Sequence, residues 1–135
     1  SDLIGYDANS AYASPSYYAQ AMFASHIGTE VLGSDLQGAG DRVFTSVTRD
    51  AAKGVMYVKL VNASSVKQDV KISLVGANVK STAKLISLSA ATTAATNSIT
   101  DPKRVVPVES TVKVGKEFTR TLPGYSVEVL ELGVQ

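Results

Sequence analysis

Residues 43–62, VFTSVTRDAAKGVMYVKLVN, decide the fold class of this 135-residue chain. The sequence predicts two strands here, residues 43–49 and 55–62, joined by a short turn. In the second strand, apolar side chains stand at every second position: Met56, Val58 and Leu60. A period of two is typical of a strand with one face buried, so the stretch predicts a β-hairpin.

The same period recurs in several short segments after this hairpin. Further strands are predicted at residues 70–74, 83–89, 108–114, 117–122 and 126–132. Residues 90–107, rich in Thr, Ala, Ser and Asn, are predicted to form a long ordered loop. About eight short strands at this spacing predict an all-β sandwich or barrel, because two antiparallel sheets bury their apolar faces on each other.

One helix is expected, and it lies close to the N-terminus. Ser14 is a suitable N-cap and Pro15 a suitable first helical residue, so the helix is predicted over residues 15–25. Gly28 is expected to end it in the left-handed conformation. Its large apolar residues, Tyr17, Tyr18, Met22 and Phe23, lie on more than one face. Such a helix needs partners on two sides, and the chain therefore resembles part of a larger protein.

The composition argues against several classes of partner. The 13 basic and 12 acidic residues nearly balance, and the basic ones are scattered, so we expect no binding to nucleic acid. No apolar run approaches the ~20 residues that a membrane span needs, so no membrane partner is expected. The absence of cysteine excludes disulfides and thiolate chemistry.

The residues also predict no catalytic, metal or cofactor site. His26 is the single histidine, and a lone histidine at a helix end is seldom a metal ligand. The acidic residues fall in turns or at strand positions expected to face solvent, as for Glu128. The possible sugar-contact aromatics are Tyr57 and Tyr125, since an aromatic face can stack on a sugar ring. The absence of tryptophan weakens that reading.

Five segments together resemble a known family. They are SPSYYAQAMF (14–23), SVTRD (46–50), VMYVKLVNAS (55–64), ATNSITDPKRVVPV (95–108) and LPGYSVEVLEL (122–132). Over nearly the whole chain, the sequence resembles the C-terminal region of the α-L-arabinofuranosidases of glycoside hydrolase family 51. In that family a (β/α)₈ barrel carries two catalytic glutamates, and a jelly-roll-like β-sandwich follows it.

The resemblance implies a division of the chain. Residues 1–27 would be the last loop and helix of the catalytic barrel, and residues 28–135 the C-terminal sandwich. The helix residues Tyr17, Tyr18, Met22 and Phe23 then become candidates for packing against the barrel. The family's acid/base glutamate lies in an Asn-Glu pair, which this sequence lacks, so neither catalytic glutamate carries over and we expect the chain alone to be inactive.

The resemblance also implies what the parent enzyme does. It would remove terminal arabinofuranosyl groups from arabinan or arabinoxylan by a retaining mechanism, and this substrate class favours an extracellular or periplasmic location. The expected partners are the barrel of the same protein, the arabinose-containing polysaccharide through the parent enzyme, and a second copy through the helix. Two alternatives stay open, a carbohydrate-binding module and a free-standing interaction domain.

Overall fold

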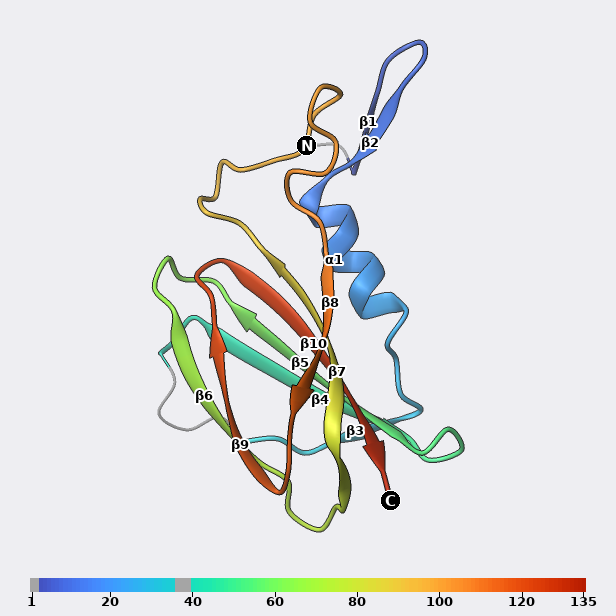
Figure 1. Cartoon of the computed structure of the whole chain (residues 1–135), viewed down its shortest axis with the longest axis vertical. Helices are drawn as coiled ribbons and strands as arrows, with labels where there is room; N and C mark the ends of the chain where they lie inside the picture. The colour runs from blue at the N-terminus through green and yellow to red at the C-terminus, as the bar shows by residue number, and fades with distance from the viewer. Residues whose placement is uncertain (1–2, 36–39) are drawn as a thin grey trace.

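The computed structural model describes residues 3–35 and 40–135 and contains ten strands and one helix in that part of the chain (Figure 1). The elements are β1 (Ile4–Tyr6), β2 (Ala11–Ala13), α1 (Pro15–Ala24), β3 (Glu30–Leu32), β4 (Val43–Asp50), β5 (Val55–Asn62), β6 (Gln68–Ser73), β7 (Val79–Ser89), β8 (Val108–Lys113), β9 (Glu117–Leu122) and β10 (Ser126–Val134). In this part of the chain no helix has the length and apolar character needed to cross a bilayer.

All strand pairs are antiparallel, which confirms the predicted all-β sandwich with one N-terminal helix. One sheet has six strands in the order β3-β4-β5-β10-β7-β8, and β6 pairs with β9 in a sheet of two. Strands β1 and β2 form a separate two-stranded sheet, a hairpin. The number of strands exceeds the expected eight because β1, β2 and β3 have three residues each, too few for a period of two to stand out.

The main core lies between the six-stranded sheet and the β6–β9 sheet. Its fully buried members include Leu60 on β5, Leu122 on β9, and Leu130 and Leu132 on β10, each with 0 or 1% of its surface exposed. Burial of each such side chain is worth about 1.5–3 kcal/mol, so this layer supplies much of the stability of the sandwich.

A buried ion pair joins the two sheets. Glu128 of β10 is 1% exposed and accepts hydrogen bonds from Arg120 of β9 at 2.8–3.1 Å and from the Ser87 hydroxyl at 3.0 Å. The prediction that Glu128 faces solvent is therefore wrong. Glu128 shares the inward face of β10 with Leu130, and its charge is accommodated there because the Arg120 guanidinium reaches it from the facing sheet.

Helix α1 covers the other face of the six-stranded sheet. Met22 is 5% exposed and packs in a second core with Tyr57, Ile86, Leu88, Val105 and Val129. The helix begins as predicted, with the Ser14 hydroxyl accepting from the Tyr17 amide at 3.1 Å. At its other end, the Lys59 ammonium donates to the Phe23 carbonyl at 3.1 Å, and burial lowers the pKa of Lys59.

The predicted role of Gly28 is wrong. The helix ends at Ala24, followed by Ser25 in the right-handed helical conformation, and Gly28 is not among the residues with positive φ. Glycine is needed here because a Cβ would stand 2.6 Å from the backbone of Arg49, where the chain enters β3.

The buried ion pair generates the first testable prediction. Arg120→Met leaves the Glu128 carboxylate buried without its cation, so the free energy of unfolding should fall by about 2–4 kcal/mol. Urea denaturation measures this change. The control is Arg49→Met, which breaks a solvent-exposed pair with Glu30 and should cost less than about 1 kcal/mol. Equal losses in the two variants would contradict the structural role given to Glu128.

Candidate functional site

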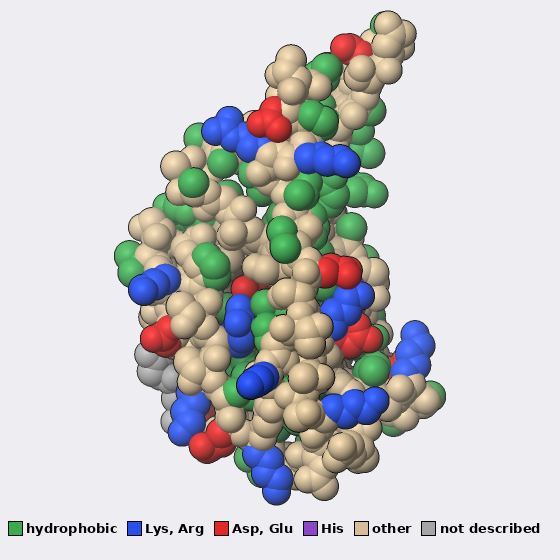
Figure 2. All heavy atoms as spheres, in the orientation of Figure 1, with side chains coloured by type: hydrophobic (Ala, Val, Ile, Leu, Met, Phe, Trp, Pro, Cys, Tyr) green, Lys and Arg blue, Asp and Glu red, His purple; other side chains and the backbone are tan. Residues whose placement is uncertain are grey.

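The first candidate surface is an exposed apolar end of the molecule, here called the hairpin end. In Figure 1 the β1–β2 hairpin projects beyond the sandwich, at the end where the loop between β7 and β8 also lies. Its exposed apolar side chains are Leu3, Ile4, Tyr6, Tyr17 and Ile99, with Tyr6 at 81% exposure. Hydrophobic side chains gather along this end in Figure 2. Gathered apolar groups of this kind mark interaction surfaces more often than isolated ones do.

One buried side chain fixes the hairpin end to the sandwich. Asn97 is 1% exposed and donates to the Ala13 carbonyl at 2.9 Å and to the Val105 carbonyl at 2.8 Å. Its own oxygen accepts from the Val105 amide at 2.7 Å. The hairpin is also tied to the start of α1, because the Ser14 amide donates to the Leu3 carbonyl at 2.9 Å. The long loop is therefore ordered, and the hairpin end has a fixed geometry.

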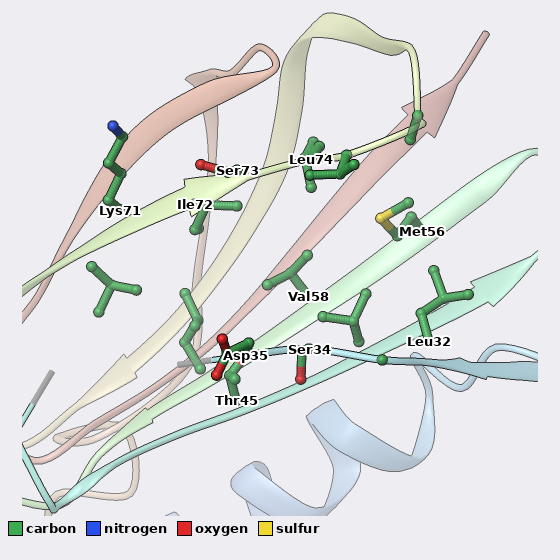
Figure 3. Close-up of a pocket in the computed structure, with 16 residues that line it drawn as sticks. Leu32, Ser34, Asp35, Thr45, Met56, Val58, Lys71, Ile72, Ser73 and Leu74 are labelled. Carbon is green, nitrogen blue, oxygen red and sulfur yellow. The ribbon is translucent and has the colours of Figure 1, made fainter. Parts of the chain in front are cut away.

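The second candidate surface is a groove of about 330 Å³ between the sheets, here called the sheet groove. Its floor is formed by the inward side chains of β4 and β5, and its sides by β6 with the turn that follows it and by residues 32–35 at and after the end of β3. In Figure 3, Ile72 of β6 lies across from Val58 of β5, with Met56 and Leu32 further along. Most of the lining is apolar, so the groove is suited to aliphatic side chains rather than to a sugar.

The structure separates the four helix residues proposed for barrel packing. Met22 is buried within the chain itself, whereas Tyr17 is 39% exposed. Tyr18 and Phe23 are half-buried, and both pack against the second core. Of the four, Tyr17 has the most surface left for another partner.

The two aromatics proposed for sugar contact also differ. Tyr57 is 6% exposed and packs beneath α1, with the His26 ring edge-on at 5.6 Å, so neither of its faces is open to a sugar ring. Tyr125 is half-buried beside a small apolar notch, with Ala19 of α1 and Leu88 of β7 among its other walls. The turn before β10 holds Tyr125 at a φ of 48°, the only positive value among the described non-glycine residues.

The titratable side chains of the described residues are mostly engaged in local contacts. Within residues 3–35 and 40–135 no three His, Asp or Glu residues gather in a way that could hold a metal ion. The single histidine, His26, contacts the Met22 carbonyl at 2.6 Å and the Ser25 hydroxyl at 3.1 Å. Glu30, Glu109, Glu117 and Glu128 each form an ion pair.

A protein-family model matches most of the chain. The model described as the α-L-arabinofuranosidase C-terminal domain matches residues 1–126. Among curated proteins, α-L-arabinofuranosidase A of Aspergillus niger is 36% identical over 132 residues, which is 96% of this chain and 20% of that protein. The extracellular exo-α-L-arabinofuranosidase of Streptomyces chartreusis is 44% identical over 87 residues, or 64% of this chain and 10% of that protein.

Solved structures give the same result. The arabinose-bound MgGH51 α-L-arabinofuranosidase matches the whole chain with a TM-score of 0.93 and 34% identity, over 22% of its own length. The α-L-arabinofuranosidase of Thermotoga maritima, at 19% identity and a TM-score of 0.83, shares the fold. The chain spans about a fifth of the length of the curated relatives that it matches over nearly its whole length.

Asn97 gives a prediction for the hairpin end. Asn97→Ala removes three hydrogen bonds and leaves the buried Val105 amide without its acceptor, so it should destabilise the chain by about 2–3 kcal/mol. It should also speed proteolysis of the β7–β8 loop. Urea denaturation and limited proteolysis measure the two effects. Thr96→Ala, at an exposed neighbouring position, should change stability by less than about 0.5 kcal/mol. Matching effects in both variants would rule out the special role of Asn97.

Proposed function

The chain belongs to the family of α-L-arabinofuranosidase C-terminal domains, and we propose that its task is to pack against the catalytic domain of the same polypeptide. The observation that carries this proposal is the hairpin end. Five large apolar side chains are exposed there on a frame that Asn97 holds in place. A rigid apolar surface lowers the entropic cost of docking, because little has to be ordered when the partner arrives.

The proposal divides the chain at about residue 27. Residues 1–27 would continue the catalytic (β/α)₈ barrel, and residues 28–135 form the accessory sandwich. Two faces of α1 would then have different partners: Met22 holds the helix on the sandwich, while Tyr17 and the hairpin meet the barrel. This arrangement explains why a ten-residue helix has large apolar groups around much of its circumference.

The parent enzyme is proposed to be a retaining glycoside hydrolase of family 51 that releases terminal α-L-arabinofuranosyl groups. The support is that the relatives matched over most of this chain are named α-L-arabinofuranosidases. Retaining hydrolysis uses a nucleophilic carboxylate and an acid/base carboxyl group about 5–5.5 Å apart. In this chain four of the glutamates are held in ion pairs instead, so the catalytic pair would lie in the barrel.

Docking through the hairpin end can be tested with Tyr6→Asp. In the 135-residue chain the side chain is 81% exposed, so stability should change by less than about 0.5 kcal/mol. In the longer enzyme the new charge would be buried against the barrel, and the free energy of unfolding should fall by about 2 kcal/mol or more. Val66→Asp, exposed elsewhere on the sandwich, is the control and should affect neither protein. An unchanged longer enzyme with Tyr6→Asp would contradict the docking proposal.

The proposal also predicts that the 135-residue chain has no glycosidase activity, because the carboxylate pair belongs to another domain. The measurement is the release of the aryl group from an aryl α-L-arabinofuranoside, with heat-treated protein as the control. Turnover that copurifies with the intact 135-residue chain, at a rate above that control, would overturn the assignment of catalysis to the barrel.

A further inference from the structure

Strand β8 forms one edge of the six-stranded sheet. It pairs with β7 on one side, and on its other side no strand of the described chain is bonded to it. Every residue of β8 except Val112 is exposed, and Val108 has 61% of its surface exposed. An unpaired edge presents a row of backbone N–H and C=O groups with which another strand can pair.

The register of β7 and β8 shows which backbone groups of β8 are free. The Val114 amide donates to the Ser81 carbonyl at 3.0 Å, so these two residues form a hydrogen-bonded pair. Such pairs alternate along an antiparallel ladder. Counting back from Val114, the even-numbered residues of β8 bond to β7, and the odd-numbered residues direct their backbone groups to the open edge. The odd-numbered residues are Glu109, Thr111 and Lys113, and no backbone bond from them to any other described segment exists.

The side chains of these three residues carry a charge pattern that is complementary to its own reverse. Glu109 and Lys113 lie two positions to either side of Thr111, and all three side chains are on the face of the sheet that α1 covers. Two copies of β8 can pair antiparallel about a two-fold axis at Thr111. Glu109 of each copy then stands opposite Lys113 of the other, and the two Thr111 side chains meet at the axis. Opposite charges and Thr–Thr pairs directly across a strand pair are both stabilising.

This register is also the one that pairs the most backbone groups. It matches all three outward-facing residues with outward-facing residues of the other copy. An axis at Glu109 or at Lys113 would pair like charges instead and shorten the ladder. Pro107 occupies the next outward-facing position and has no amide, so the ladder ends there.

The opposite face of β8 fits the same register. Val108 would lie across from Val114 of the other copy, on the side of the main core. Val108 is exposed in the single chain, and Val114 is half-buried against that core. Pairing would therefore cover an exposed apolar side chain and continue a core that already exists.

We infer that the open edge of β8 binds a second copy of this chain, β8 against β8, so that the six-stranded sheets of the two copies form one continuous sheet. The interface is isologous and closes on itself, which predicts a dimer rather than a filament. The inference goes beyond the proposed docking to the catalytic domain, because it uses the β8 edge and not the hairpin end.

The position of α1 is compatible with this dimer. The helix packs on Ile86 and Leu88, toward one end of β7, whereas the axis at Thr111 lies beside Lys84. A two-fold rotation about this axis moves the second helix to the opposite end of the joined strands. Lys84 and Glu109 form an exposed ion pair at 3.4 Å, so the Glu109 carboxylate stays accessible to a second ammonium group.

Sedimentation equilibrium of the 135-residue chain tests the inference. The unmodified chain should dimerise reversibly as its concentration rises. Lys113→Glu sets two carboxylates opposite each other in both charge pairs, so it should weaken the dimer about tenfold or more. The double variant Glu109→Lys/Lys113→Glu restores opposite charges and should recover most of the association. Lys67→Glu makes the same change of charge at an exposed position before β6, and it should leave the dimer intact.

Three outcomes of this experiment would overturn the inference. The first is a chain that stays monomeric at every concentration. The second is equal association in Lys113→Glu and Lys67→Glu. The third is a double variant that associates no better than Lys113→Glu. A dimer that is lost in Tyr6→Asp but kept in Lys113→Glu would place the second copy at the hairpin end and also refute the β8 edge.

Hydrogen–deuterium exchange of individual amides gives a second readout. The amides of Glu109, Thr111 and Lys113 should exchange about tenfold or more slowly in concentrated than in dilute samples of the chain, because pairing protects them. The amides of Ser110 and Val112 bond to β7 in both states and serve as the internal reference. Edge amides whose exchange does not depend on concentration refute the β8 dimer. That result would leave the barrel docking untouched, since Tyr6→Asp in the longer enzyme tests docking separately.

Discussion

The structure depends on one sheet that must be buried on both faces. One of its two central strands, β10, is flanked by β5 and β7, and Val129 and Leu130 are both 0% exposed although they point to opposite sides. A sheet with apolar side chains on both faces needs a packing layer on each face. The β6–β9 sheet covers one face, and α1 with Val105 from the long loop covers the other. The helix is thus a second layer of the sandwich rather than an appendage.

The sequence could predict the strands because their apolar periodicity is local. The start of the helix could also be predicted, since the cap formed by Ser14 and Pro15 depends on neighbouring residues alone. The elements that cover each face of the sheet could not be predicted, because alternation of apolar residues shows that a face is buried but not which element buries it. Tyr57 illustrates this limit: as an aromatic residue it was a candidate for stacking on a sugar, but it is buried in the core that includes Met22 of α1.

Glu128 could not be placed from sequence for a different reason. A carboxylate in a strand sequence is ordinarily predicted to face solvent. The folded structure is needed to show that Arg120 of β9 lies close enough to pair with Glu128. Asn97 belongs to the same class. Its side chain bonds to backbone groups of Val105, 8 residues away, and of Ala13, 84 residues away, so no local pattern predicts that it joins these segments. The family resemblance did include Asn97 among its motifs, and the structure supplies the physical reason.

The two surfaces left open follow from the same requirement for cover. On the outer face, α1 satisfies the sheet but retains apolar groups of its own at the hairpin end. On the inner face, two strands cannot span six, and the sheet groove marks where they fall short. The hairpin end adjoins the core beneath α1, so a partner could cover it without rearranging the sandwich. A partner at the hairpin end would extend the layer that α1 already forms, so the elements that stabilise the sandwich would also hold the docking surface in place.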